Sequence, residues 1–274
     1  MSSPRWKMLC DTRSVNVGPA LLLERHIADW LRAQVVAPGV ELHDDPDIVW
    51  VVHPGSAWSN AGVMIRLAAK TAAARLDVLV GRYRQHQRGM GLWVTQAATP
   101  ETLPQLLRDR GLRCRKHFPA MLRDLSSPVH VHRLPIGITI RPVEDPEQFQ
   151  VPHPFIGPLT TPLRRAAFQT WSSLLRLTDN RCHALVAWCG DIAVGATMTF
   201  LGSECAGLHG VDVLEAYRGR GIGAALVDHS SRWAAERGAS RIVLLATGMG
   251  EGVYRRCGFE QVARFGYWYR SFQR

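Results

Sequence analysis

Hydrophobic positions in the first half of the chain follow helical spacing in some segments and strand spacing in others. Apolar side chains at Leu22, Ile27 and Leu31, with charges between them, predict an amphipathic helix over 19–35. The continuous apolar run 48–52 predicts a buried strand. The remaining pattern predicts a helix over 61–87, a strand over 92–95, a helix opened by 99–101 and ended at 111, and a strand over 112–122.

The second half of the chain has a similar mixture of helical and strand patterns. Apolar side chains at Phe168, Trp171 and Leu175 predict a helix over 163–177. Cys189-Gly190-Asp191 lies between two apolar runs and predicts a hairpin turn. The other expected elements are strands over 138–141, 183–188, 192–200 and 208–213, a helix over 222–236, a strand over 241–246, a short helix over 251–256 and a strand within 261–270.

A segment with two prolines and no regular spacing lies near the midpoint, which is typical of a linker. Because 274 residues suffice for two domains of ordinary size, we predict domains over 1–125 and 137–274, joined by a linker over 126–136. His130 and His132 alternate inside this linker. No cysteine or carboxylate cluster lies near them in the sequence, so we interpret them as loop residues and expect no metal.

The last elements predicted for the first half resemble those predicted for the second half. Residues 107–112 line up with 254–259, and each segment reads as the end of a helix, a glycine and the opening of an apolar strand. Together with the similar order of helices and strands, this indicates a duplicated domain whose first copy has diverged.

The amino-acid composition and net charge limit the classes of protein to which this chain could belong. With 46% hydrophobic and 20% charged residues, the chain should fold around a core. A net charge of +10 favours anionic partners, but the arginines are scattered, which argues against nucleic-acid binding. The six cysteines form no CxxC pair, so neither a zinc knuckle nor a disulfide framework is expected. We find no signal peptide or membrane span and expect a cytoplasmic protein with no membrane partner.

A glycine-rich turn carries the clearest chemical signal. Gly219, Gly221 and Gly223 stand between an apolar strand and an amphipathic helix. A turn with few Cβ atoms lets a diphosphate approach the main-chain N–H groups at the start of a helix, where the helix dipole also favours negative charge. Arg218 and Arg220 add positive potential. The segment therefore predicts an anion site.

The same turn passes a loose dinucleotide-binding fingerprint, which would make the protein an NAD enzyme. That loop should follow its strand at once and open a series of parallel strands and helices. Here residues 214–218 intervene, and the preceding strands read as antiparallel. The context therefore argues against NAD.

Residues 213–224 resemble motif A of the GCN5-related N-acetyltransferase superfamily, whose pattern of Arg or Gln, x, x, Gly, x, Gly or Ala is filled by Arg218, Gly221 and Gly223. Residues 254–259 are similar to that family's closing helix and its Tyr-x-x-x-Gly-Phe signature. The match covers 138–270 and is weak over 1–125. The resemblance implies an α+β fold, with a central, mostly antiparallel, twisted sheet whose strands splay and helices that flank it. It also implies two tandem copies, the first degenerate and without a cofactor loop.

The resemblance further implies an N-acyltransferase, most directly an N-acetyltransferase, that moves an acyl group from acetyl-CoA or another acyl-CoA to a primary amine by direct attack. Tyr254 would act as the general acid toward the CoA thiolate. Main-chain groups of Val211 and Val213 would hold the pantetheine and the thioester oxygen. The loop residues that would bind the diphosphate are Arg218, Gly219, Arg220, Gly221, Ile222, Gly223 and Ala224.

The general base is harder to predict, because relatives often place a glutamate on the strand of Val211 and none stands here. His209 lies two residues earlier, so we expect it on the same strand face, and an ordinary histidine pKa near 6.5 suits the role. Asp212 and Glu204 are weaker candidates. Glu215 replaces a proline that is common in the family.

Several functional alternatives stay open. The acceptor is an amine-bearing small molecule or peptide, and residues 142–162 with the helix around Trp171 occupy the region that usually shapes its site. The donor could instead be a long-chain acyl-CoA or an acyl carrier protein, whose acidic surface would suit the positive charge. A non-catalytic CoA sensor or adaptor is the other alternative. The N-terminal domain could be a lid, a homodimer surface or part of the acceptor pocket.

Overall fold

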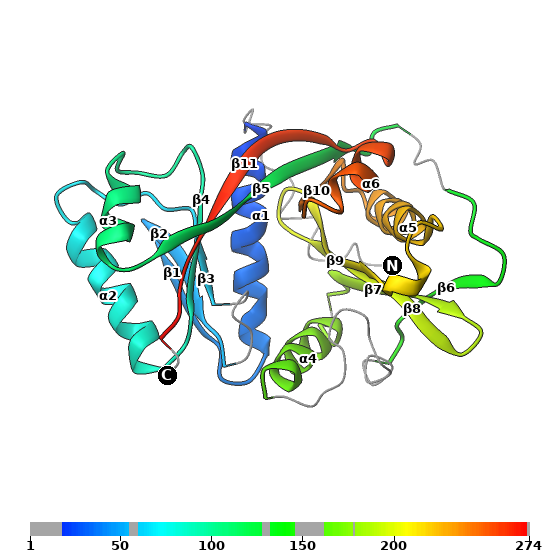
Figure 1. Ribbon diagram of the computed structural model, residues 1–274, viewed down its shortest axis with the longest axis horizontal. Coiled ribbons are helices and arrows are strands. Elements are labelled where there is room, and N and C mark those ends of the chain that lie inside the picture. The colour runs from blue at the N-terminus through cyan, green and yellow to red at the C-terminus, as the bar shows by residue number, and fades with distance from the viewer. Residues whose placement is uncertain (1–17, 55–59, 128–131, 146–161, 178, 273–274) are drawn as a thin grey trace.

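The computed structural model describes residues 18–54, 60–127, 132–145, 162–177 and 179–272. Their strands form one 11-stranded sheet with the order β1-β2-β3-β4-β11-β5-β10-β9-β8-β7-β6 (Figure 1). In chain order the elements are α1 (Pro19–Ala33), η2 (Gln34–Val36), β1 (Glu41–Asp45), β2 (Ile48–Val52), β3 (Ala61–Val63), α2 (Ala72–Gln85), β4 (Met90–Val94), α3 (Leu103–Asp109), β5 (Arg113–Asp124), β6 (Ile138–Pro142), α4 (Pro162–Leu175), β7 (Cys182–Cys189), β8 (Ile192–Leu201), β9 (Ala206–Val213), η4 (Glu215–Tyr217), α5 (Ile222–Glu236), β10 (Arg241–Leu245), α6 (Glu251–Arg256) and β11 (Glu260–Arg270).

The two halves of the chain exchange their last strands. β5 ends the first half yet pairs with β10 of the second, and β11 ends the chain yet pairs with β4 of the first. The two long strands also pair antiparallel with each other and cross the middle of the molecule (Figure 1). The sheet is therefore continuous from one half to the other. That residues 126–136 link two domains therefore remains a prediction.

The unit β4-α3-β5 has the same order and connections as β10-α6-β11. Gly111 follows α3 with φ 76°, and Gly258 follows α6 with φ 80°. Both glycines thus end a helix in the left-handed conformation, which costs glycine little because it has no Cβ. The parallel pairs also correspond, since β3 runs parallel to β4 and β9 runs parallel to β10. This agreement supports a duplication, while the degeneracy of the first copy stays a prediction.

Strand β2 explains how the core of the first half is built. Ile48, Trp50 and Val52 pack with the inner face of α2, whereas Val49 and Val51 pack with α1 on the opposite face. Every residue of the strand is buried, because helices cover both faces of the sheet here. In the second half, α5 packs along β7, β8 and β9. The expectation of a mixed α/β, mostly antiparallel sheet flanked by helices is confirmed.

One expectation about the elements is wrong, and one strand was not expected at all. The segment expected as a helix over 61–87 forms the strand β3 and then α2. Ala61 and Val63 are buried at strand spacing, and Gly62 lies so close to β4 that a Cβ there would stand 2.8 Å from Leu92 Cδ2. The polar strand β1 had no predicted counterpart, because an edge strand with mostly charged residues has no apolar alternation.

The other predicted elements occur within a few residues of their expected bounds, and α5 and α6 have the bounds predicted for them. Within the described part of the chain, no helix has the length and apolar character needed to cross a bilayer. Two features of the sequence lie outside the described residues. They are His130 and most of the proline-rich stretch, 146–161.

Candidate functional site

Strands β9 and β10 diverge after a short parallel contact. β10 pairs with β9 only at Ala206–Ile242 and Gly207–Val243. β9 then continues for six more residues, to Val213, paired with β8 on its other side. The splayed strands expected from the family resemblance are therefore present. The edge of β9 that faces away from β8 could accept an extended ligand through its main chain.

A β-bulge interrupts β9 inside this splayed region. Gly210 has φ 59°, and the register slips so that two residues, Gly210 and Val211, oppose Thr197 alone. The Thr197 hydroxyl donates to the carbonyl oxygen of His209 at 3.2 Å. The extra residue changes which side chains share a face. Leu208 and Val211 both pack in the cluster that contains Tyr254.

His209 consequently lies on the other face of β9, and the expectation that it shares a face with Val211 is wrong. Its imidazole stacks on Trp30 of α1, with ring centroids 4.1 Å apart and planes at 16°. Its Nε2 lies 3.1 Å from Nε2 of His26, also on α1. Burial, and then the neighbouring His26, lowers the pKa of His209 well below its usual value. The ring is therefore neutral at physiological pH.

The glycine loop before α5 has the backbone geometry that its sequence predicts. Gly219 has φ 75°, and Gly221, the residue immediately before α5, has φ 85°. Both are exposed, and a Cβ built on either would meet nothing within 4 Å. The first N–H groups of a 15-residue helix thus lie beside an open, side-chain-free surface. This geometry suits a diphosphate.

The remaining loop residues divide into arginines on the surface and apolar anchors beneath. Arg218 Nε donates to the carbonyl oxygen of Val213 at 3.0 Å, and Arg220 donates to that of Ala216 at 3.1 Å. Both guanidinium groups thus stay beside the loop and add positive potential. Ile222 and Ala224 are buried, so their side chains fix the start of α5, and only their main chain could reach a ligand.

Among the described residues of the first half, the connection between β3 and α2 has no equivalent loop. The segment 64–71, between β3 and α2, contains no glycine. Backbone hydrogen bonds bridge it to the segment before α3: Thr99 N donates to Ile65 O at 3.1 Å, and Leu67 N donates to Thr99 O at 3.2 Å. Of these two corresponding connections, the one before α5 is therefore the one that could admit a diphosphate in this way.

Tyr254 lies on α6 and points into the core beside the splayed strand. Its side chain is 9% exposed and packs edge-on against Phe259, with centroids 5.9 Å apart. Gly250 allows this position, because a Cβ there would lie 2.7 Å from the tyrosine ring. Burial, with smaller contributions from Cys257 and Asp212, raises the pKa of Tyr254 to about 12. The phenol is therefore protonated at neutral pH and can donate a proton.

Asp212 belongs to the same electrostatic environment. It is half-buried on β9, and Val213 N donates to its carboxylate at 2.9 Å. Burial raises the pKa of Asp212, and its charge in turn contributes to the raised pKa of Tyr254. Glu204 is exposed and bound to Arg25 at 2.5 Å. From the sequence alone Asp212 and Glu204 are both weaker candidates for the base, and their different burial becomes visible only in the structure.

The helix around Trp171 is part of the core between the halves. Trp171 is buried with Ala184 and Met198, and Trp30 of α1 packs against it edge-on at 6.1 Å. Its apolar content therefore has a structural explanation. Sequence reasoning found no role for Trp30 and His26, which reach the second half only through tertiary packing.

Comparison with known proteins agrees with this geometry. Residues 147–259 match the model of the acetyltransferase (GNAT) family. A search of curated proteins found no match. A GCN5-related N-acetyltransferase from Kribbella flavida superposes with a TM-score of 0.70 at 17% identity, covering 90% of this chain and 95% of that one. A tandem GNAT protein from the clavulanic acid biosynthesis pathway gives 0.62 at 12% identity, with the same coverage.

A GCN5-related N-acetyltransferase from Sphaerobacter thermophilus gives a TM-score of 0.58 at 18% identity, covering 86% of this chain and 76% of that one. At these identities the structural likeness establishes the fold, and the family model covers the segment that carries the glycine loop and Tyr254. Residues 147–259 thus match a GNAT acetyltransferase domain, and the chain as a whole has the fold of these solved structures.

Proposed function

We propose that this protein is an acyl-CoA-dependent N-acyltransferase that transfers an acetyl group from acetyl-CoA to a primary amine. One observation carries the proposal: the open glycine loop at the start of α5 lies one short 3-10 turn after a strand that has parted from its neighbour. A diphosphate on the loop and an extended arm along the strand match two consecutive parts of coenzyme A, its diphosphate and its pantetheine arm.

The donor would be held mainly by main-chain groups. The N–H groups at Gly219 to Ala224 would bind the diphosphate, assisted by Arg218 and Arg220. The pantetheine arm would follow the edge of β9 along Val211 and Val213. A main-chain N–H there, aimed at the thioester oxygen, would stabilise the developing negative charge by about 3 kcal/mol.

Tyr254 would donate its proton to the departing thiolate. Its high pKa keeps the phenol protonated, and its place on α6 beside the splayed strand supports this role. The acceptor amine must lose a proton as it attacks the thioester carbon. Asp212 fits the role of base, because its carboxylate shares the environment of Tyr254 and its pKa is raised. His209 remains the alternative base, although Trp30 covers one face of its ring.

Isothermal titration with acetyl-CoA and CoA tests the donor site. Gly219→Asp adds a negative charge where a Cβ meets open space, and aspartate tolerates a positive φ better than most residues. The matched control is Gly190→Asp, at a hairpin turn with φ 56° and equally open space. We expect about tenfold or greater loss of affinity for Gly219→Asp alone. If the wild-type protein binds neither ligand, the proposal fails.

Mass spectrometry after incubation with acetyl-CoA and a panel of amines then tests transfer. A product with the added acetyl group supports the proposed activity. Transfer only from longer acyl-CoAs or from an acylated carrier protein would replace acetyl-CoA as the donor. Tight CoA binding without transfer to any amine would favour a sensor or adaptor.

A further inference from the structure

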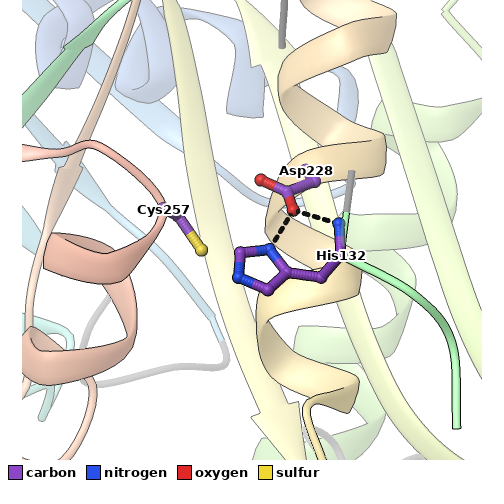
Figure 2. A group of neighbouring side chains, drawn as sticks. All are labelled: His132, Asp228 and Cys257. Carbon is purple, nitrogen blue, oxygen red and sulfur yellow. Dashed lines mark hydrogen bonds and ion pairs between the residues drawn. The ribbon is translucent and has the colours of Figure 1, made fainter. Parts of the chain in front are cut away.

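Three side chains of different chemistry converge away from the glycine loop. His132 comes from the segment between the halves, Asp228 from the middle of α5, and Cys257 from the residue that ends α6 (Figure 2). One nitrogen, one oxygen and one sulfur from these residues all lie within 4.8 Å of one another. Residues far apart in the sequence therefore meet at one point.

Asp228 is the centre of this cluster. Its carboxylate is 1% exposed, and Oδ2 accepts hydrogen bonds from the His132 backbone N at 2.9 Å and ring Nδ1 at 2.5 Å. Arg123 donates to Oδ1 at 3.1 Å. In Figure 2 the Cys257 sulfur points toward the edge of the imidazole ring. Cys257 is buried, whereas the His132 side chain is 35% exposed, so solvent reaches the cluster from that side.

We propose that His132, Asp228 and Cys257 form a binding site for Zn²⁺ or a chemically similar divalent transition metal, with water as the fourth ligand. The donor set of imidazole, carboxylate and thiolate is the set that Zn²⁺ uses in proteins. Mg²⁺ and Ca²⁺ require oxygen ligands, which only Asp228 supplies here. The exposed side of His132 gives the metal a route of entry and a place for the water.

Binding would rearrange protons as well as side chains. Burial raises the pKa of Cys257 to about 12, so the metal-free residue is a thiol, and binding must release its proton to solvent. Nδ1 of His132 would bind the metal after its proton moves to Nε2. Tetrahedral ligation places donors about 3.3 to 3.6 Å apart. The Nδ1 to Oδ2 distance would therefore widen by about 1 Å.

The charges around the site are compatible with a divalent ion. A thiolate and a carboxylate together neutralise the charge of Zn²⁺. Arg123 would remain bound to the second carboxylate oxygen, where a donor orients a ligating carboxylate. Arg123 and Arg256 also act on Cys257. Their positive charge repels the metal but also favours the thiolate form of Cys257 that would bind it. Because protons and the metal compete for this sulfur, binding should weaken as pH falls.

The site would fasten the segment between the halves to two helices that matter for the proposed donor site. α5 begins at the glycine loop, and α6 carries Tyr254. A metal bound to both helices would hold the loop and the tyrosine in a fixed relationship. The role is therefore structural, and it does not depend on which acyl group is transferred.

Calorimetric titration of chelator-treated, full-length protein with Zn²⁺ tests the site, with Co²⁺ absorption as a second readout. We expect one ion to bind with a thiolate-to-cobalt charge-transfer band. His132→Ala and Cys257→Ser should each lower the affinity for Zn²⁺ about tenfold or more, and Cys257→Ser should abolish the band. The controls His229→Ala, one position from Asp228 on α5, and Cys189→Ser, on β7, should bind as wild type does.

Circular dichroism confirms that each variant is folded. If Cys257→Ser does not fold, the Zn²⁺ affinity of His132→Ala still tests the proposal. The His132 side chain is partly exposed, so its removal leaves the core intact. Absence of Zn²⁺ binding to the wild-type protein would overturn the proposal. Equal affinity in wild type and His132→Ala would overturn it too, because the ion would then be bound elsewhere.

Discussion

His26 on α1 and His209 on β9 bring the two halves of the protein into direct contact, with their Nε2 atoms 3.1 Å apart. The His26 ring is buried and the His209 ring is partly buried, and burial lowers the pKa of each, that of His26 to about 4. Two neutral imidazoles can share one hydrogen bond, in which one Nε2 donates and the other accepts. The first half therefore contributes side chains to the structure around the splayed strand.

Gly207 makes this contact possible, so Gly207→Ala should destabilise the protein. A Cβ at Gly207 would lie 1.7 Å from His26 Nε2, and the ring would have to move. Overpacking of this kind costs about 1–3 kcal/mol. Urea unfolding measures the change in free energy.

The control for Gly207→Ala is Gly81→Ala, within α2, where a Cβ meets nothing within 4 Å. It should stabilise the protein by about 0.4–1 kcal/mol, because alanine favours helix over glycine. If Gly207→Ala is as stable as wild type, the two halves can separate here without cost and the contact has no importance for folding.

Tyr254→Phe should lower kcat about 100-fold while the KM for acetyl-CoA changes little. The ring keeps its packing against Phe259, and only the proton donor for the thiolate is lost. Steady-state kinetics with acetyl-CoA and an acceptor identified from the amine panel measures both constants. Tyr217→Phe, beside the loop, is the control and should keep its activity. Unchanged turnover in Tyr254→Phe would remove the residue from the mechanism.

The pH dependence of kcat/KM should distinguish the two candidate bases. A base must be deprotonated, so activity falls as pH drops through its pKa. If Asp212 is the base, its raised pKa sets the acidic limb of the profile, and Asp212→Asn removes most of the activity. His209→Ala should then leave the shape of the profile unchanged. Loss of the acidic limb in His209→Ala alone would instead identify the histidine.

Stability should fall in mild acid because several histidines are buried in the neutral form. Burial lowers the pKa of His26, His53 and His183 to about 4. Their ordinary value is about 6.5, so between these values the unfolded chain binds more protons than the folded chain. Folding free energy is therefore lost as pH falls from about 6.5 to 4 and is fully present above that window.

His183→Phe tests this account at one position. The imidazole stacks on Trp233, with centroids 4.6 Å apart and planes at 5°, and a phenyl ring can keep that stacking without titrating. The variant should lose less stability between pH 6.5 and 4 than the wild type, as measured by thermal unfolding across that range. An unchanged slope would show that His183 does not contribute.

The local spacing of apolar, polar and glycine residues predicted most of the secondary structure and the glycine loop of the candidate site. The glycine loop was predictable because positive φ angles and close approach to main-chain donors both require glycine, as Gly219 and Gly221 show. The face of His209 was not predictable, because a single bulge at Gly210 reverses the alternation on which the expectation rested. The order of residues does not reveal a bulge that hydrogen bonding to the neighbouring strand defines.

By itself the sequence predicted two similar halves and, in the second, an anion-binding turn before a helix, with Tyr254 at a fixed spacing after it. These features depend on residues close together in the chain. Only the tertiary structure decided that β5 and β11 change places, that α1 packs His26 and Trp30 against β9, and that His132 meets Asp228 and Cys257. Such contacts join residues far apart in the sequence. They form because strands from both halves pair in one sheet and because helices and strands bury their apolar faces against each other.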